Sequence, residues 1–242
     1  MLSPEHRAEL SVCPALVEML EGERARARDG GMLELHSTST PNNLFVLRRL
    51  FGEIQATATL ETGLGYGASC ALLAACHKAA GAAPAQQHVA IDPFQSTDWK
   101  DAAHMLLEKA ALSDYAEIIS KTSALHLPAL CAAGRVFDLI YVDGSHLFED
   151  VFMDFYHARF LLRKGGVILF DDCQIPHVAK VLRFITTNLR EGFRELDLSP
   201  FRADGGRTLK YRAARMLGKV QLRAFEKTGD SERHIGSAFV DF

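Results

Sequence analysis

The sequence predicts an α/β protein with a doubly wound, mostly parallel seven-stranded sheet and a helical cap at its N-terminus. Three observations support this fold class. Short apolar runs alternate with longer amphipathic segments from residue 57 onward, a glycine-rich turn follows the first run, and acidic residues end several others. Strands that alternate with helices are joined by right-handed crossovers, which build a parallel sheet covered by helices on both faces.

The expected strands are short and rich in apolar residues, as strands buried in a parallel sheet are. Five belong to the regular pattern and two lie near its end, at residues 57–61, 88–92, 116–120, 137–143, 166–172, 194–198 and 219–227. The segments between them predict helices at residues 69–76, 101–112, 149–162 and 177–189.

The first 56 residues predict further helices, one of them with Thr40 as its N-cap and Pro41 at its first position. No stretch of the 242 residues resembles a domain linker. We therefore expect one domain over residues 1–242, with residues 1–56 as a helical cap and residues 57–242 as the α/β core.

Composition indicates a globular protein and disfavours a polymer as its partner. The chain is 48% hydrophobic and 24% charged with a net charge of -3, so neither a nucleic acid nor a membrane is expected as a partner. Its five cysteines are scattered, which favours free thiols in a reducing cytoplasm. The N-terminus has charges where a signal peptide needs apolar residues, and the apolar N-terminal helix could serve a homo-oligomer interface.

The glycine-rich turn is "ETGLGYG", which contains Glu61, Gly63, Gly65 and Gly67. Glycines allow a tight turn and close approach of a ligand, and the helix that follows offers free N–H groups. A turn that only packs helix against strand and a nicotinamide dinucleotide site both remain open, the latter because Gly63, Gly65 and Ala68 satisfy G-x-G-x-x-A. Asp92 could accept hydrogen bonds from a ribose, but it lies 29 residues after Gly63, whereas the dinucleotide fingerprint expects ~20.

Three aspartates end the fourth and fifth strands of the pattern, namely Asp143, Asp171 and Asp172. Neighbouring parallel strands bring such residues to the same edge of a sheet. Close carboxylates repel unless a cation lies between them, and oxygen ligands suit a hard divalent ion such as Mg²⁺. The alternative is that these aspartates cap the following helices. His146 is the candidate proton acceptor, because an unperturbed histidine has a pKa of ~6.5.

These residues resemble the class I S-adenosylmethionine-dependent methyltransferases over roughly residues 57 to 227. The segment from Glu61 to Gly67 is similar to that family's first motif, and Asp92 matches its ribose-binding acid. The strand ends "FDLIYVDGSH" and "LLRKGGVILFDD" resemble those of catechol-type O-methyltransferases. Those enzymes have a lysine base where this sequence has His146, a departure shared with metal-dependent enzymes that methylate macrolide sugars and with related cephalosporin-modifying enzymes.

The resemblance implies a complete site. Its cofactor part would hold S-adenosylmethionine through Glu61, Gly63, Gly65, Tyr66, Gly67, Ser69, Asp92, Phe94, Ser123 and Asp143. Asp143, Asp171 and Asp172 would bind Mg²⁺, and His146 would take the acceptor's proton. The implied reaction is O-methylation of a sugar or natural-product hydroxyl.

Three other functions remain open at this point. A nicotinamide-dependent oxidoreductase would leave the three strand-end aspartates unexplained, and no Tyr-x-x-x-Lys pair is recognisable. An iron-dependent oxygenase normally needs two histidines and one carboxylate, and only His146 is available beside the aspartates. A cofactor-binding protein without activity would be expected to lack the acids or His146.

Overall fold

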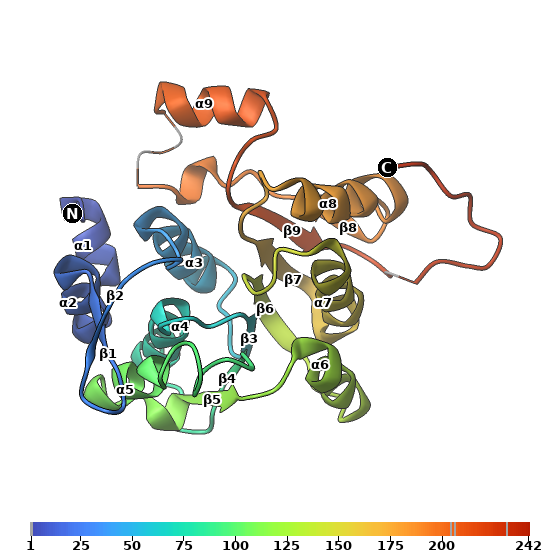
Figure 1. The fold of residues 1–242 in the computed structure, drawn as a ribbon. Helices are drawn as coiled ribbons and strands as arrows, with labels where there is room; N and C mark the ends of the chain where they lie inside the picture. The colour runs from blue at the N-terminus through green and yellow to red at the C-terminus, as the bar shows by residue number, and fades with distance from the viewer. Residues whose placement is uncertain (1, 204, 206, 231) are drawn as a thin grey trace. The chain divides into compact units, whose positions relative to one another are not determined.

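The computed structural model describes residues 2–203, 205, 207–230 and 232–242. It confirms the predicted fold class, with seven strands in the order β5-β4-β3-β6-β7-β9-β8 (Figure 1). The pairings β3–β4, β4–β5 and β6–β7 are parallel, whereas β9 runs antiparallel to β7 and β8. The chain divides into two compact units, one of residues 1–122 with 201–203 and the other of residues 123–200 with 204–242.

The first unit contains three parallel strands of the sheet with the helices that precede and connect them. Its helices are α1 (Pro4–Leu10), α2 (Pro14–Gly22), α3 (Pro41–Glu53), α4 (Ala68–Ala79), α5 (Ala102–Lys109) and the 3₁₀ helix η1 (Ser113–Tyr115). Its sheet strands are β3 (Thr59–Thr62), β4 (His88–Ile91) and β5 (Ala116–Ile119). Every residue of β3 and β4 is buried, as in a central parallel strand, although β3 contains Thr59, Glu61 and Thr62 and β4 begins with His88.

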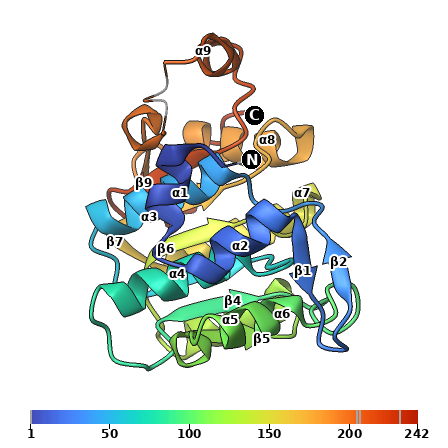
Figure 2. The same ribbon diagram turned by 90° about the vertical axis from the view of Figure 1, so that its left-hand side faces the viewer.

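The N-terminal cap differs from the prediction of helices alone. Between α2 and α3 the chain forms an antiparallel hairpin of β1 (Arg24–Arg26) and β2 (Met32–Glu34), which Figure 2 shows beside α2. Each strand has only three residues, and Ala25 is the one buried residue of the pair. So short a strand presents no hydrophobic period, and the sequence analysis therefore missed the hairpin. The predicted Thr40 cap is confirmed, because its hydroxyl accepts a hydrogen bond from the Asn43 N–H.

The second unit contains the other four strands. Its helices are α6 (Ser123–Ala132), α7 (Phe148–Leu161), α8 (Pro176–Asn188) and α9 (Leu209–Met216), and its strands are β6 (Phe137–Val142), β7 (Leu162–Phe170), β8 (Phe193–Glu195) and β9 (Arg223–Lys227). A 3₁₀ helix, η2 (Ser199–Phe201), also lies in this part of the sequence. Helices α6 and α9 were not predicted. Helix α6 is interrupted by Pro128, and α9 is short, with no buried residue among those described.

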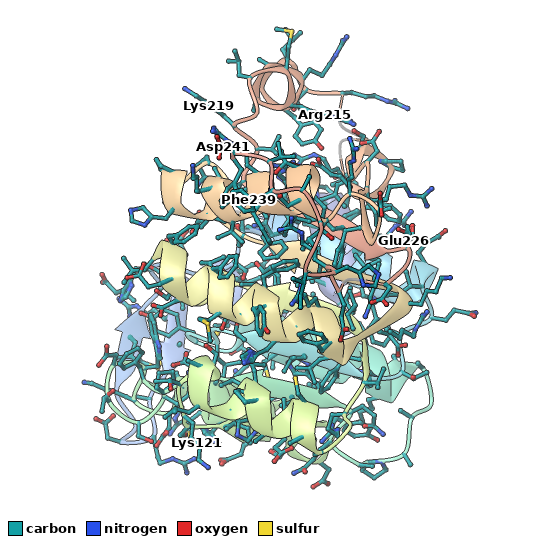
Figure 3. All side chains as sticks on the ribbon, turned by 90° about the vertical axis from the view of Figure 1, so that its right-hand side faces the viewer. Lys121, Arg215, Lys219, Glu226, Phe239 and Asp241 are labelled. Carbon is teal, nitrogen blue, oxygen red and sulfur yellow. The ribbon has the colours of Figure 1, made fainter. Side chains whose placement is uncertain are left out.

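Ion pairs strengthen the antiparallel edge of the second unit. Arg194 pairs with Glu226 at 2.5 Å and Arg223 with Glu195 at 2.6 Å, so that each pair joins β8 to β9. Arg215 of α9 pairs with Asp197 at 2.5 Å, and Figure 3 shows Arg215 on α9 together with Glu226 on β9. These contacts fix the strand register where the sequence pattern is weakest.

Within the described residues, no helix has the length and apolar character needed to cross a membrane.

Candidate active site

The glycine turn of the first unit joins β3 to α4. The Gly63 N–H donates to the Ile91 carbonyl at 2.9 Å, and the Gly67 N–H donates to the Leu64 carbonyl at 2.8 Å. Gly67 has φ +84°, and a Cβ built on it would lie 2.6 Å from the Cβ of Ala103 in α5. A Cβ on Gly65 would meet only the Ser37 carbonyl, at 4.0 Å. Gly67 is therefore required for packing, whereas the space beside Gly65 is open to a ligand.

Asp92, the predicted ribose acid, holds this turn in place. Its Oδ2 accepts hydrogen bonds at 3.1 Å from the backbone N–H groups of Leu64 and Gly65 and from Gln95 Nε2. Its Oδ1 accepts from the Phe94 N–H at 2.8 Å. Each carboxylate oxygen offers about two acceptor positions, so these bonds occupy Oδ2 fully and leave one position on Oδ1. The side chain is also only 4% exposed. Asp92 thus organises the backbone around the expected cofactor.

Two neighbours of Asp92 differ in exposure. Gln95 is completely buried, and its Nε2 also donates to the Gly65 carbonyl at 2.9 Å, which makes it a second support of the turn. Phe94 is 53% exposed, so its ring is available to stack on a planar ligand. The sequence analysis named Phe94 but not Gln95, because nothing in a loop glutamine signals such contacts.

Glu61 lies inside the core in this structure. Its side chain is fully buried, and Oε1 lies 3.2 Å from Nε2 of His88, which is also fully buried. The thiol of Cys70 in α4 is close by, and burial, followed by the neighbouring Glu61, raises the pKa of Cys70 well above its usual value. On the far side of the imidazole, His88 Nδ1 and His77 Nε2 each lie 2.9 Å from the Thr59 hydroxyl. The acid of the glycine motif therefore belongs to a buried polar network.

Tyr66, at the centre of the glycine turn, anchors the segment that follows the hairpin. Its phenol donates to the Glu34 carbonyl at 3.0 Å, and its ring packs edge-on against His36 and Trp99 at centroid distances of 5.5 and 5.0 Å. Ser69, in the first turn of α4, is buried and 4% exposed. The segment after β2 is thus fastened to the expected cofactor turn.

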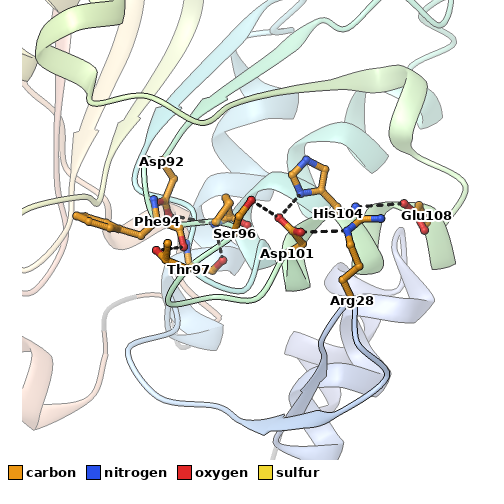
Figure 4. A network of polar contacts seen from close by, with 10 residues as sticks. Arg28, Asp92, Phe94, Ser96, Thr97, Asp101, His104 and Glu108 are labelled. Carbon is orange, nitrogen blue, oxygen red and sulfur yellow. Dashed lines mark hydrogen bonds and ion pairs between the residues drawn. The ribbon is translucent and has the colours of Figure 1, made fainter.

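A polar network ties the same hairpin to the loop that follows Asp92 (Figure 4). Arg28 Nε donates to Asp101 Oδ2 at 3.0 Å, and Ser96 Oγ donates to Asp101 Oδ1 at 2.9 Å. The Arg28 N–H also donates to the Lys100 carbonyl at 2.9 Å. Lys100 and Asp101 both have left-handed backbones, with φ of 47° and 57°. External contacts support this otherwise unfavourable stretch of chain.

In the second unit, parallel pairing brings the predicted acidic residues together. Val142 at the end of β6 pairs with Phe170 at the end of β7, and the Asp171 N–H donates to the Val142 carbonyl at 3.0 Å. Asp171 is 4% exposed. Its Oδ2 accepts from the Tyr141 phenol at 2.6 Å, and its Oδ1 accepts from the Asp172 N–H at 2.7 Å.

Asp143, His146 and Asp172 converge at the end of this strand pair. Each offers one ligand atom, and these atoms all lie within 4.8 Å of one another. His146 Nε2 is 3.0 Å from Asp172 Oδ2, and Gln174 Nε2 donates to Asp172 Oδ1 at 2.8 Å. The His146 side chain is 43% exposed, which leaves it accessible to a substrate. Two carboxylates and an imidazole fit a divalent cation, although the imidazole is not a typical Mg²⁺ ligand.

The structure thus gathers the candidate residues into one group in each unit. Ser123, expected near adenine, is the first residue of α6 and half-buried in the second unit. Cys173 follows the acidic pair directly, and burial together with Asp171 raises the pKa of its thiol well above the usual value. The sequence analysis missed Tyr141 and Gln174, because a strand tyrosine and a loop glutamine have no distinctive pattern.

Part of the chain matches a known family, and its fold is shared with solved structures. Residues 60–173 match a family model described as a methyltransferase domain. A search of curated proteins found no match. The fold is similar to TomG, an O-methyltransferase of tomaymycin synthesis from Streptomyces achromogenes in complex with S-adenosylmethionine, at 17% identity and a TM-score of 0.60 over 95% of this chain and 92% of TomG.

Two further solved structures share this fold. An O-methyltransferase from Bacillus cereus in complex with S-adenosylhomocysteine has 19% identity and a TM-score of 0.59, over 90% of this chain and 91% of that one. A methyltransferase from Podospora anserina with bound S-adenosylhomocysteine has 18% identity and a TM-score of 0.57, over 89% of this chain and 88% of that one. At such identities the likeness establishes the fold.

Proposed function

We propose that the protein is a class I methyltransferase that transfers the methyl group of S-adenosylmethionine to a hydroxyl oxygen of a small molecule, a proposal supported by the match of residues 60–173 to a methyltransferase-domain model and by the shared fold. The observation that supports oxygen as the acceptor atom is the convergence of Asp143, His146 and Asp172 at the ends of β6 and β7. A hydroxyl is a weak nucleophile, so its methylation benefits from a cation and a base, and this group of residues offers both.

The first unit would bind the cofactor. The open space beside Gly65 and the free N–H groups at the start of α4 suit the methionine end, which carries a carboxylate. The half-exposed ring of Phe94 suits the adenine. Asp92 and Gln95 would act by fixing the turn, since their hydrogen bonds already join its two sides.

The second unit would bind and activate the acceptor. Asp143 and Asp172 would hold a divalent cation, Mg²⁺ in the first instance, which when bound would polarise the acceptor hydroxyl. Because His146 Nε2 faces Asp172, the carboxylate would orient the imidazole and leave Nδ1 to take the proton. The oxygen would then bond to the methyl carbon while the carbon–sulfur bond breaks and leaves its electron pair on sulfur.

The acceptor we propose is a sugar or natural-product hydroxyl. The sequence features behind this choice are "DGSH" and the acidic pair that follows it, Asp171 and Asp172. We propose no nucleic acid and no membrane as a partner. The protein would act in the cytoplasm, and its apolar N-terminal helix would be compatible with a homo-oligomer.

A calorimetric titration tests the cofactor directly. S-adenosylhomocysteine and NAD are each titrated into the protein, with and without Mg²⁺. We expect binding of S-adenosylhomocysteine alone, and binding of NAD alone would refute the proposal. With a hydroxylated acceptor found by screening sugars and natural products, EDTA should lower turnover and Mg²⁺ should restore it. Turnover that EDTA leaves intact would remove the cation from the mechanism.

A further inference from the structure

Tyr141 is a fully buried residue of β6 whose phenol reaches the acidic site. We propose that Tyr141 is a positioning residue that holds Asp171, and through it Asp172, in the orientation that binds the cation. The inference rests on the cation of the proposed function. It adds a residue that touches neither cation nor substrate and that no sequence motif indicates.

The hydrogen bond between Tyr141 and Asp171 is short and buried. The Tyr141 phenol donates to Asp171 Oδ2 at 2.6 Å, and the two residues are 0% and 4% exposed. A hydrogen bond of this length lies at the short end of the range for O–H···O contacts. The phenol therefore satisfies an oxygen of Asp171 in a place that water hardly reaches.

The strand environment indicates why this residue is a tyrosine. All six residues of β6 are buried, and Tyr141 pairs with Leu169 of β7 in a predominantly apolar layer. A phenylalanine would fill the same space without introducing a polar group that needs a partner. A buried phenol is tolerated when it is hydrogen-bonded, and here one partner is the carboxylate beside the site.

The other oxygen of Asp171 carries the effect to its neighbour. Oδ1 accepts from the Asp172 N–H at 2.7 Å, and Asp172 has a left-handed backbone with φ 50°. That conformation is unfavourable for a residue with a side chain, and the hydrogen bond supports it. Through this peptide, a fixed Asp171 sets the direction of Asp172, whose Oδ2 lies 3.0 Å from His146 Nε2.

Replacing the phenol without changing the shape isolates this role. Loss of a hydrogen bond directly behind a metal ligand typically lowers metal affinity about 10–100-fold, and Tyr141 acts one step further back, through Asp171. We therefore expect Tyr141→Phe to bind Mn²⁺ and Mg²⁺ about 10-fold more weakly than the natural protein in calorimetric titrations. The matched control is Tyr156→Phe, on the exposed side of α7 in the same unit, which should leave the affinity unchanged.

A double-mutant cycle with Asp171→Asn separates positioning from general destabilisation. If Tyr141 acts through Asp171, Tyr141→Phe should weaken binding much less in the Asp171→Asn background than alone. An equal loss in both backgrounds would overturn the inference, as would an unchanged affinity of Tyr141→Phe. If the natural protein binds neither ion, the cation of the proposed function fails as well. Urea unfolding of each variant identifies any loss of folded protein.

Discussion

Replacing Asp92 by Asn tests whether this acid organises the glycine turn. Asn keeps the size of the side chain but removes the charge and turns one acceptor oxygen into a donor. If its oxygen takes the place of Oδ2, its NH₂ group faces the Phe94 N–H, which now donates to Oδ1 at 2.8 Å. The Phe94 N–H would then lose its acceptor, and the three hydrogen bonds now made to Oδ2 would go to a neutral oxygen instead of a charged one.

The magnitude follows from these four bonds. An unsatisfied buried donor costs about 1–3 kcal/mol, and each hydrogen bond that changes from a charged to a neutral acceptor loses about 1 kcal/mol. The free energy of unfolding should therefore fall by roughly 4–6 kcal/mol. For a chain of this length each kcal/mol corresponds to about 2–4 °C, so the melting temperature should fall by on the order of 10 °C.

The assay compares ligand-free protein with its complex. Urea or thermal unfolding measures the stability of the free protein, and calorimetry measures its affinity for S-adenosylhomocysteine. Asp98→Asn is the control, because this exposed acid lies in the same loop. If Asp92→Asn bound the ligand weakly but unfolded like the natural protein, Asp92 would serve only as a ribose acceptor and the present reasoning would fail.

Three further predictions concern the same unit. Gly67→Ala should lower the free energy of unfolding in urea by about 2–4 kcal/mol, because the new Cβ would lie 2.6 Å from that of Ala103. Gly65→Ala should lower it by only about 1 kcal/mol, and equal costs would contradict this account. Glu61→Gln should lower the free energy of unfolding by about 3–5 kcal/mol, because it breaks a buried pair with His88, and a cost under about 1 kcal/mol would show that the pair is not ionic. Burial raises the pKa of Cys76 to about 12. The unfolded thiol ionises near ~8.5, so the folded state binds more protons between these values, and Cys76 alone should lower stability by about 1.4 kcal/mol per pH unit above pH ~9, in addition to what the other buried thiols contribute. Cys76→Ala should reduce that slope in unfolding curves at pH 8 to 11, and an unchanged slope would refute the assignment.

The strands of the sheet core could be predicted because their burial leaves a direct trace in the sequence. The run that ends at Ile91 contains only apolar residues after His88, and the run from Phe137 to Val142 has a single charge. Parallel topology then puts the residues after Val142 and Phe170 side by side, as the observed register does. For the acidic site, strand order was therefore enough to expect proximity.

Side-chain direction and main-chain hydrogen bonds could not be predicted in this way. Glu61 lies on a strand that is buried on both faces, and its acidic side chain suggested contact with a ligand. In the structure this side chain lies beside His88. All four partners of Asp92 are donors from the backbone or from a loop glutamine that follows no motif. The hairpin was missed because three-residue strands are shorter than any detectable period.

The acidic residues predicted to bind the cofactor or the cation fall into two groups by the solvent exposure of their side chains. Glu61, Asp92 and Asp171 are at most 4% exposed, and each contacts groups of its own chain. Asp143 and Asp172 are partly exposed, and their ligand atoms converge with that of His146. A buried carboxylate that already accepts hydrogen bonds is less free to turn toward a ligand, whereas a partly hydrated one needs only to lose water. We therefore expect the buried acids mainly to support the geometry of the backbone and of their neighbours, and the partly exposed acids to be the ones that meet a cation or a substrate.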